Sequence, residues 1–210
     1  MTRLLLFPGS GSDRTHSSLL AVEAAVAPMA VVRADFPYRT AGRRAPDRAP
    51  VLLQAVRQQA AALLADDDRL VLGGRSMGGR ICSMAVAGVG DGEPKVKAKG
   101  LVLIAYPLHP PGKPDTLRVE HFSRLKVPCL FVSGTRDSFG TPDELTAWTA
   151  SIPGKVTHVW IDGKGHDLKG CDDRIAVEVA AWITRLRGRG RRGSVPPVRG
   201  AQSRGTTRTR

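Results

Sequence analysis

The sequence predicts an α/β fold built on one six-stranded, mainly parallel sheet with helices on both faces. Three observations lead to this prediction. Short apolar runs alternate along the chain with longer segments of helical periodicity, the order expected for strands joined by helical crossovers. The apolar runs are continuous, as in strands that are buried on both faces. The 210 residues are enough for a single domain with a full core.

Each predicted strand is a short apolar run, and most of these runs stop at a glycine, a proline or an aspartate, which favour turns. In chain order the strands are residues 4–7, 30–34, 69–73, 100–106, 127–133 and 155–161. In a parallel sheet, the loops that follow the strands open on one edge, where ligands bind. The loops expected to share this edge begin at Pro8, Phe36, Gly74, Pro107, Gly134 and Asp162.

Helices are predicted between the strands and after the last one. They span residues 17–28, 51–64, 77–89, 141–151 and 173–186. Apolar residues recur in them with a period near 3.6, most clearly in the second helix. The fourth helix has Thr141 as its N-cap, Pro142 in its first turn and Glu144 three residues on, which is a capping-box arrangement. The segments 36–50 and 107–126 are predicted to be loops.

Residues 74–78, Gly-Arg-Ser-Met-Gly, match the pattern G-x-S-x-G between a predicted strand and a predicted helix. A serine on such a tight turn projects clear of the sheet, and its small neighbours let the strand and the helix pack closely. The pattern therefore predicts that Ser76 is a nucleophile. The alternative is a glycine-rich turn that contains a serine by coincidence.

A serine hydroxyl needs a base to become a nucleophile, and the base needs an acid to orient it. His166 follows the last predicted strand, and Asp137 follows the strand at 127–133. The chain order Ser76, Asp137, His166 is the order found where G-x-S-x-G joins a strand to a helix. Asp143 is better explained as a first-turn helix residue, and Asp162 is too near His166 in sequence to orient its ring easily.

Three sets of residues are predicted to contact the substrate. The N–H groups of Met77 and of Ser10 or Gly11 are candidate oxyanion donors, although a flexible glycine turn would also explain the loop at Ser10 and Gly11. A long loop carries His109, which is a further candidate contact. Arg43 and Arg44 follow the second strand and are candidates to hold an anionic substrate group. A solvated charged loop is the alternative for these two arginines.

The net charge of +13 is unevenly distributed. Eight arginines and no acids lie between residues 187 and 210, which leaves +5 for the other 186 residues. This end is rich in glycine and poor in apolar residues, so the sequence predicts a domain at residues 1–187 and a disordered Arg/Gly-rich tail at 188–210. Such a tail can contact nucleic acid weakly through phosphates, or it can be a solvated extension without a partner.

The remaining composition predicts a cytoplasmic protein without a membrane span. No apolar run approaches the length that a membrane requires, and residues 4–7 are too few for a signal-peptide core. The three cysteines are widely spaced and suit free thiols in a reducing compartment. No C-x-x-C pair supports a zinc site, and no metal or cofactor is expected.

Three stretches resemble the α/β-hydrolase superfamily: GGRSMGGR, AYPLHPPGKP at 105–114 and SGTRDSFGTPDEL at 133–145. They are similar to its compact dienelactone-hydrolase-related branch, which includes testis-expressed protein 30-like proteins. The resemblance covers residues 1 to about 187. It implies a hydrolase without a cap domain, with Ser76 as nucleophile, Asp137 as acid and His166 as base. Many relatives carry His-Gly where this chain has Pro8-Gly9, which affects the loop geometry because proline has no N–H.

Two classes of function follow from these residues. The first is a serine hydrolase, esterase- or thioesterase-like (EC 3.1), that cleaves a small-molecule ester, thioester or amide through an acyl-enzyme on Ser76. The second is a non-catalytic scaffold of the same fold that binds a partner or nucleic acid. A scaffold has no need for all three of Ser76, Asp137 and His166, so the sequence favours the hydrolase. The acyl group and the oligomeric state are not specified by the sequence.

Overall fold

A computed structural model of the chain describes residues 1–64, 69–90 and 94–189. Its strands are β1 (Thr2–Phe7), β2 (Ala30–Arg33), β3 (Arg69–Arg75), β4 (Gly100–Ile104), β5 (Cys129–Gly134) and β6 (Val156–Ile161). Its α-helices are α1 (Ser17–Ala25), α2 (Pro37–Thr40), α3 (Ala49–Leu63), α4 (Met77–Ala87), α5 (Pro142–Thr149) and α6 (Asp172–Arg189). A short 3₁₀ helix, η1 (Phe122–Arg124), lies between β4 and β5.

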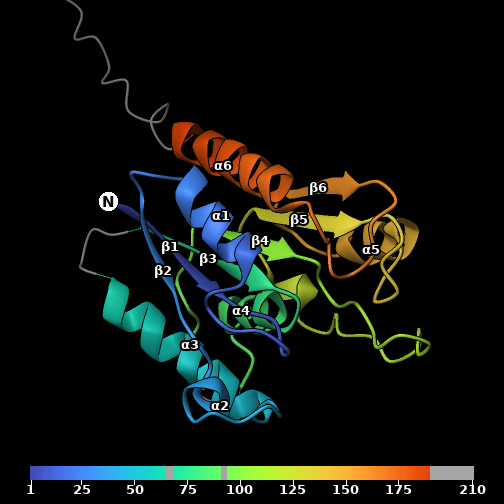
Figure 1. Cartoon of the computed structure of the whole chain (residues 1–210), viewed down its shortest axis with the longest axis horizontal. Helices are drawn as coiled ribbons and strands as arrows, with labels where there is room; N and C mark the ends of the chain where they lie inside the picture. The colour runs from blue at the N-terminus through green and yellow to red at the C-terminus, as the bar shows by residue number, and fades with distance from the viewer. Residues whose placement is uncertain (65–68, 91–93, 190–210) are drawn as a thin grey trace, which may run out of the picture.

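The strands form one sheet in the order β2-β1-β3-β4-β5-β6, and every neighbouring pair is parallel (Figure 1). The predicted six-stranded α/β fold is therefore confirmed. Because the strands are parallel, their carboxyl ends and the loops that follow them meet at one edge of the sheet.

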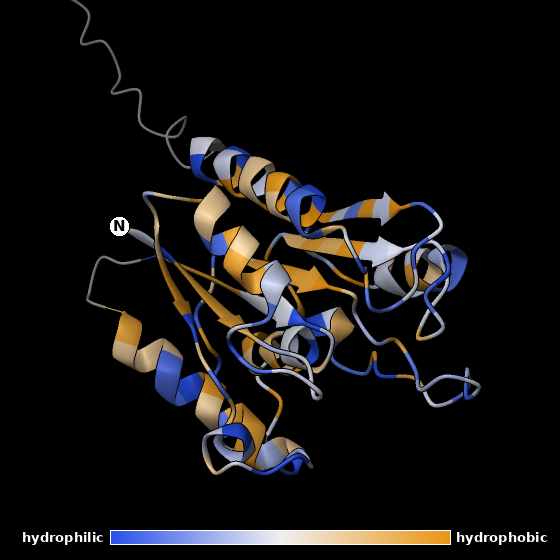
Figure 2. Ribbon diagram, in the orientation of Figure 1, coloured by the Kyte–Doolittle hydropathy of each residue, from blue (hydrophilic) through white to orange (hydrophobic). Residues whose placement is uncertain are grey.

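Two apolar cores lie on opposite faces of the sheet. Along β1, Leu4 and Leu6 belong to one core and Leu5 and Phe7 to the other, because side chains alternate along a strand. Helices α1 and α6 cover the first face, and α3 and α4 cover the second (Figure 1). The central strands β3, β4 and β5 are buried and mostly apolar along their length, whereas the edge strands β2 and β6 are partly exposed (Figure 2).

Several boundaries differ from the prediction because of proline. Helix α1 ends at Ala25 instead of residue 28, since a residue that precedes a proline disfavours the helical conformation and Pro28 follows. Helix α3 begins at Ala49, with Pro50 in its first turn, two residues before the predicted start. The predicted loop at 36–50 contains α2, which begins at Pro37. The capping box of α5 is confirmed: Thr141 Oγ1 accepts from the Glu144 N–H, and Glu144 accepts from the Thr141 N–H.

The last helix, α6, reaches Arg189 and is longer than predicted. It continues three residues past the helix end predicted at residue 186, and the domain boundary predicted at residue 187 stays a prediction. Residues 190–210, the rest of the predicted disordered tail with its expected nucleic-acid contact, lie outside the described residues. Within 1–64, 69–90 and 94–189, no helix combines the length and the apolar character needed to cross a membrane.

Candidate active site

Ser76 occupies a tight turn between β3 and α4. Its backbone has φ of +49° and ψ of −118°, in a region that residues with a side chain rarely adopt. The Ser76 N–H donates to the carbonyl oxygen of Ile104 at 2.8 Å, which ties the turn to the end of β4. Such strain persists only where the surrounding structure imposes it, and it is typical of functional sites.

Glycines on both sides of Ser76 allow the turn to form. A Cβ atom at Gly74 or at Gly78 would overlap the carbonyl oxygen of Phe7, at the end of β1. Helix α4 and the end of β3 therefore pack directly on the β1 backbone. This close packing agrees with the steric reason that the sequence suggested for the small residues around the serine.

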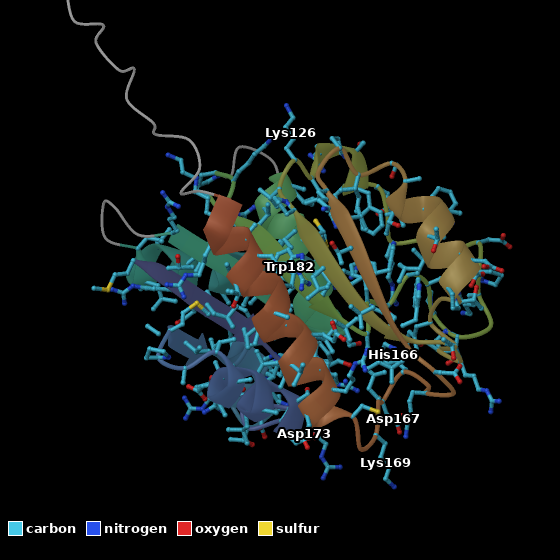
Figure 3. All side chains as sticks on the ribbon, turned by 90° about the horizontal axis from the view of Figure 1, so that it is seen from above. Lys126, His166, Asp167, Lys169, Asp173 and Trp182 are labelled. Carbon is cyan, nitrogen blue, oxygen red and sulfur yellow. The ribbon has the colours of Figure 1, made fainter. Side chains whose placement is uncertain are left out.

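His166 reaches Ser76 from the loop between β6 and α6, in which Figure 3 labels it beside Asp167. The distance between His166 Nε2 and Ser76 Oγ is 2.8 Å. The Phe139 ring stacks on the imidazole, with ring centroids 3.9 Å apart. The Arg75 guanidinium donates to the carbonyl oxygens of His166 and Asp167. The imidazole is thus held at its ring face and at its backbone.

Asp137 lies behind His166, on the turn that follows β5. Its carboxylate is buried, and its two oxygens lie 3.0 and 2.9 Å from His166 Nδ1. The Phe139 N–H also donates to Asp137, at 2.8 Å. An ionised carboxylate only accepts hydrogen bonds, so Nδ1 carries the proton and Nε2 is free to accept from the Ser76 hydroxyl. The structure thus brings the three predicted residues together in one hydrogen-bonded chain.

A cleft of about 610 Å³ opens over Ser76. It is lined by Gly9, Ser10, Gly11, Ser12, His16, Arg75, Ser76, Met77, Arg80, Pro107, Arg118, Phe139 and His166. The lining includes Met77, Ser10 and Gly11, the residues predicted to supply oxyanion donors. Met77 is the first residue of α4, where an N–H has no partner within the helix. The Tyr38 hydroxyl supports the other loop by donating to the Ser10 carbonyl oxygen at 2.9 Å.

Comparison with known proteins assigns the chain to a family. Residues 1–180 match the family described as "Alpha/beta hydrolase domain". The chain belongs to the alpha/beta hydrolase family. One solved structure with this fold is Est1E from Butyrivibrio proteoclasticus, which has 15% sequence identity and a TM-score of 0.69 over 89% of this chain and 88% of that one. A second is the RedJ thioesterase from the prodiginine pathway of Streptomyces coelicolor, with 19% identity and a TM-score of 0.63 over 86% of this chain and 85% of that one. A third is an alpha-beta serine hydrolase homologue from Coxiella burnetii, with 18% identity and a TM-score of 0.67 over 87% of this chain and 85% of that one.

Three predicted contact residues of this alpha/beta hydrolase do not line the cleft. Arg43 forms an ion pair with Asp47 at 2.7 Å, and Arg44 is exposed. The chain folds back after α2, where the Arg43 N–H donates to the carbonyl oxygen of Tyr38, so this loop stays away from Ser76. His109 is buried outside the lining, with its Nδ1 hydrogen-bonded to the carbonyl oxygen of Pro110 at 2.9 Å.

Four basic residues that line the cleft were not predicted from the sequence: His16, Arg75, Arg80 and Arg118. His16 caps α1 through Nδ1, which accepts from the Ser18 N–H at 3.2 Å. Burial and then the charge of Arg75 lower the pKa of His16. Arg80 lies one helical turn after Ser76, and this spacing is the one signal in the sequence that places it near the serine. No local pattern marks Arg118, which lies in the predicted loop at 107–126.

Proposed function

We propose that this alpha/beta hydrolase is a serine hydrolase that cleaves an ester, thioester or amide through an acyl-enzyme on Ser76. One observation carries the proposal: the continuous hydrogen-bonded chain from Ser76 Oγ through the His166 ring to the buried Asp137 carboxylate. A hydroxyl, an imidazole and a carboxylate in this order make a weak nucleophile reactive. The open cleft above Ser76 leaves room for a substrate carbonyl.

In the first step, Ser76 Oγ attacks the carbonyl carbon while His166 Nε2 accepts the hydroxyl proton. Asp137 keeps the other proton of the ring on Nδ1 and stabilises the imidazolium that forms. His166 then donates the proton to the leaving alcohol, thiol or amine as the bond from the carbonyl carbon to that group breaks. The acyl group remains esterified to Ser76.

The carbonyl oxygen gains negative charge during the attack and needs donors that are already in place. The Met77 N–H lies at the N-terminus of α4, where the helix dipole also favours negative charge. The Ser10–Gly11 turn lines the same cleft and is the source of a second N–H. Gly9 brings this turn close to the nucleophile, because a Cβ atom at Gly9 would lie 3.5 Å from Ser76 Cβ.

In the second step, water replaces the leaving group. His166 Nε2 accepts a proton from the water molecule as its oxygen attacks the acyl carbon. The proton then passes to Ser76 Oγ as the bond from the acyl carbon to Oγ breaks. The acid product leaves and the free enzyme is restored.

Names of structural neighbours support this class of chemistry, since they include a thioesterase and a serine hydrolase homologue. At identities below 20% they do not indicate which acyl group is cleaved. Membership of the dienelactone-hydrolase-related branch is part of the proposal and rests on the three sequence stretches quoted above. A cytoplasmic location is also proposed, and the three free, buried cysteines support it.

The proposal is tested by labelling with a fluorophosphonate, which reacts with an activated serine. The wild-type protein should be labelled and should hydrolyse a 4-nitrophenyl ester of a short acid. Ser76→Ala should lose both properties, whereas Ser12→Ala, the matched change of another serine in the cleft, should keep the label. If the folded wild type is not labelled and has no turnover, the proposal is wrong and the non-catalytic scaffold takes its place.

A further inference from the structure

Three arginines line the candidate active site, and acids do not. Among the described residues, the charged side chains that line the cleft are Arg75, Arg80 and Arg118, without any aspartate or glutamate. A cleft lined by one sign of charge attracts ligands of the opposite sign. The three arginines differ in the partners that the protein gives them.

Arg75 has its own partners in the fold. It is 7% exposed, donates to two carbonyl oxygens of the His166 loop, and feels the negative charges of Asp167, Asp172 and Asp137, which partly offset the lowering of its pKa by burial. Its Nη2 atom is therefore committed to the scaffold of the site, whereas its Nη1 atom is buried without a hydrogen-bond partner among the described residues.

Arg80 and Arg118 differ from Arg75. Both are half-buried, and in the described part of the chain neither forms an ion pair with a carboxylate. The Nε atom of Arg80 is buried without a hydrogen-bond partner there. Both side chains line the same cleft, and burial and then the positive charge of Arg80 lower the pKa of Arg118. Two like charges in one partly buried site, without a carboxylate partner among the described residues, are an unfavourable arrangement.

The backbones that carry the two arginines are fixed. The Arg80 N–H donates to the carbonyl oxygen of Ser76 at 3.1 Å, in the first turn of α4. The Arg118 N–H donates to the carbonyl oxygen of Leu108, and its own carbonyl accepts from the Tyr106 hydroxyl at 2.6 Å. Both guanidinium groups are therefore presented to the cleft from anchored positions on different segments.

Given the proposed hydrolase function, we propose that Arg80 and Arg118 form a subsite for an anionic oxygen group, a carboxylate or a phosphate, on the substrate. An anion held between them offsets the two positive charges, and its oxygens accept hydrogen bonds from the guanidinium groups. Guanidinium suits this task because its planar fork matches the oxygens of these groups in pairs. Arg80 lies about 6 Å along the helix from Ser76, so the anion is near the scissile bond.

The test compares esters that differ only in charge. One pair carries the charge on the acyl chain: the 4-nitrophenyl half-ester of adipic acid and the same compound with its free carboxyl methylated. A third compound carries a terminal phosphonate in place of the carboxylate. A second pair carries the charge on the leaving group: hexanoate esters of 4-hydroxybenzoic acid and of its methyl ester. For each protein, the measured quantity is the ratio of kcat/KM for the charged ester to that for the neutral ester.

Wild type should prefer the charged member of at least one pair by about 10-fold or more. Arg80→Gln and Arg118→Gln should each lower that preference by about 10- to 100-fold, the usual cost of losing a hydrogen bond between charged groups. Arg80→Lys should retain part of it. The matched control is Arg43→Gln, which changes an arginine outside the cleft and should leave the ratio unchanged.

The outcomes separate the two proposals. A wild type that hydrolyses neutral esters, with the same charge ratios in Arg80→Gln and Arg118→Gln as in wild type, overturns the subsite and leaves the hydrolase. A wild type that hydrolyses none of the esters and resists the fluorophosphonate overturns the hydrolase itself. If the two glutamine substitutions lower the kcat/KM ratio more for the phosphonate ester than for the carboxylate ester, the subsite is assigned to phosphate. The reverse result assigns it to carboxylate. Because each ratio is taken within one variant, a general loss of activity cancels.

Discussion

Arg75 and His166 are 91 residues apart in the sequence, yet the Arg75 guanidinium donates to the main-chain oxygen of His166 at 3.0 Å. The same nitrogen donates to the carbonyl oxygen of Asp167 at 2.8 Å. The residue before the proposed nucleophile thus holds the loop that carries the proposed base. Arg75 touches neither the reacting hydroxyl nor the ring nitrogens, so its expected role is to position the histidine.

This role predicts a loss of turnover without a matching loss of binding in Arg75→Met. Two carbonyl oxygens lose a charged donor, and the His166 loop gains freedom. The expected fall in kcat is about 10- to 100-fold, which corresponds to a loss of about 1.4 to 2.7 kcal/mol in transition-state stabilisation. KM should change little, because the substitution acts on the position of His166. Arg75→Lys should recover part of kcat, since an ammonium can still donate to one of the oxygens. An equal loss in the lysine and methionine variants, with matched melting temperatures, would contradict the positioning role.

The proposed nucleophile and base should behave as one unit. Ser76→Ala and His166→Ala should each lower kcat for a short 4-nitrophenyl ester by about 1,000-fold or more. The double variant should be little worse than either single variant, because removing one partner already disables the other. Circular dichroism should show intact folding in all three proteins. Additive losses in the double variant would mean that the two residues act independently.

The acid is expected to be Asp137 and no other carboxylate nearby. Asp137→Asn should lower kcat by about 1,000- to 10,000-fold, because an amide can donate to Nδ1 and stabilise the wrong tautomer of His166. Asp162→Asn is the matched control: this exposed residue accepts from the Thr135 hydroxyl at 3.1 Å and does not contact the imidazole. Steady-state turnover measures both effects. A loss confined to Asp162→Asn would transfer the role to that residue.

The tight packing around Ser76 predicts that Gly78→Ala is destabilising. The added Cβ would overlap the carbonyl oxygen of Phe7, which is rigid backbone, so α4 must move away from β1. We expect a loss of about 1–3 kcal/mol in the free energy of unfolding, measured in urea, together with reduced turnover. Gly188→Ala is the control, because a Cβ there meets open space in α6. That change should be neutral or stabilising by up to about 1 kcal/mol.

His121 predicts how stability depends on pH. Burial, with the charges of Arg80 and Arg124, lowers the pKa of His121 to about 4 from 6.5. The unfolded chain therefore binds a proton at a higher pH than the folded chain does. Neutral His121 therefore contributes to the free energy of unfolding. This contribution is fully present above about pH 6.5 and is lost as the pH falls through about 4, by about 3 kcal/mol in total.

The measurement is urea unfolding of wild type and His121→Gln across this pH range. In the native protein, Ser83 Oγ donates to the carbonyl oxygen of Arg80, so His121 Nε2 donates to Ser83 Oγ at 2.7 Å. Glutamine can keep that hydrogen bond but does not titrate. As the pH falls from 6.5 toward 4, His121→Gln should therefore lose less free energy of unfolding than wild type does. Parallel curves would contradict the prediction.

The pattern of residues along the chain was enough to predict the sheet and the positions from which the site is built. Buried parallel strands need continuous apolar runs, and those runs are visible without any tertiary information. Parallel strands also bring the loops after β3, β5 and β6 to one edge, which is why Ser76, Asp137 and His166 could be grouped before their distances were known. The tight turn at Ser76 was predictable because only small neighbours permit it.

Tertiary structure alone decided which cations face the cleft. Arg43 and Arg44 follow a strand and met the same criterion as Asp137, but the segment folds back after α2 and pairs Arg43 with Asp47. Arg118 enters the cleft from a long segment in which no periodicity constrains the path. A side chain of this length can point toward the cleft or toward solvent, and only the packing of distant segments selects between them. Local pattern sets where a strand ends, whereas the direction of an arginine depends on contacts across the whole fold.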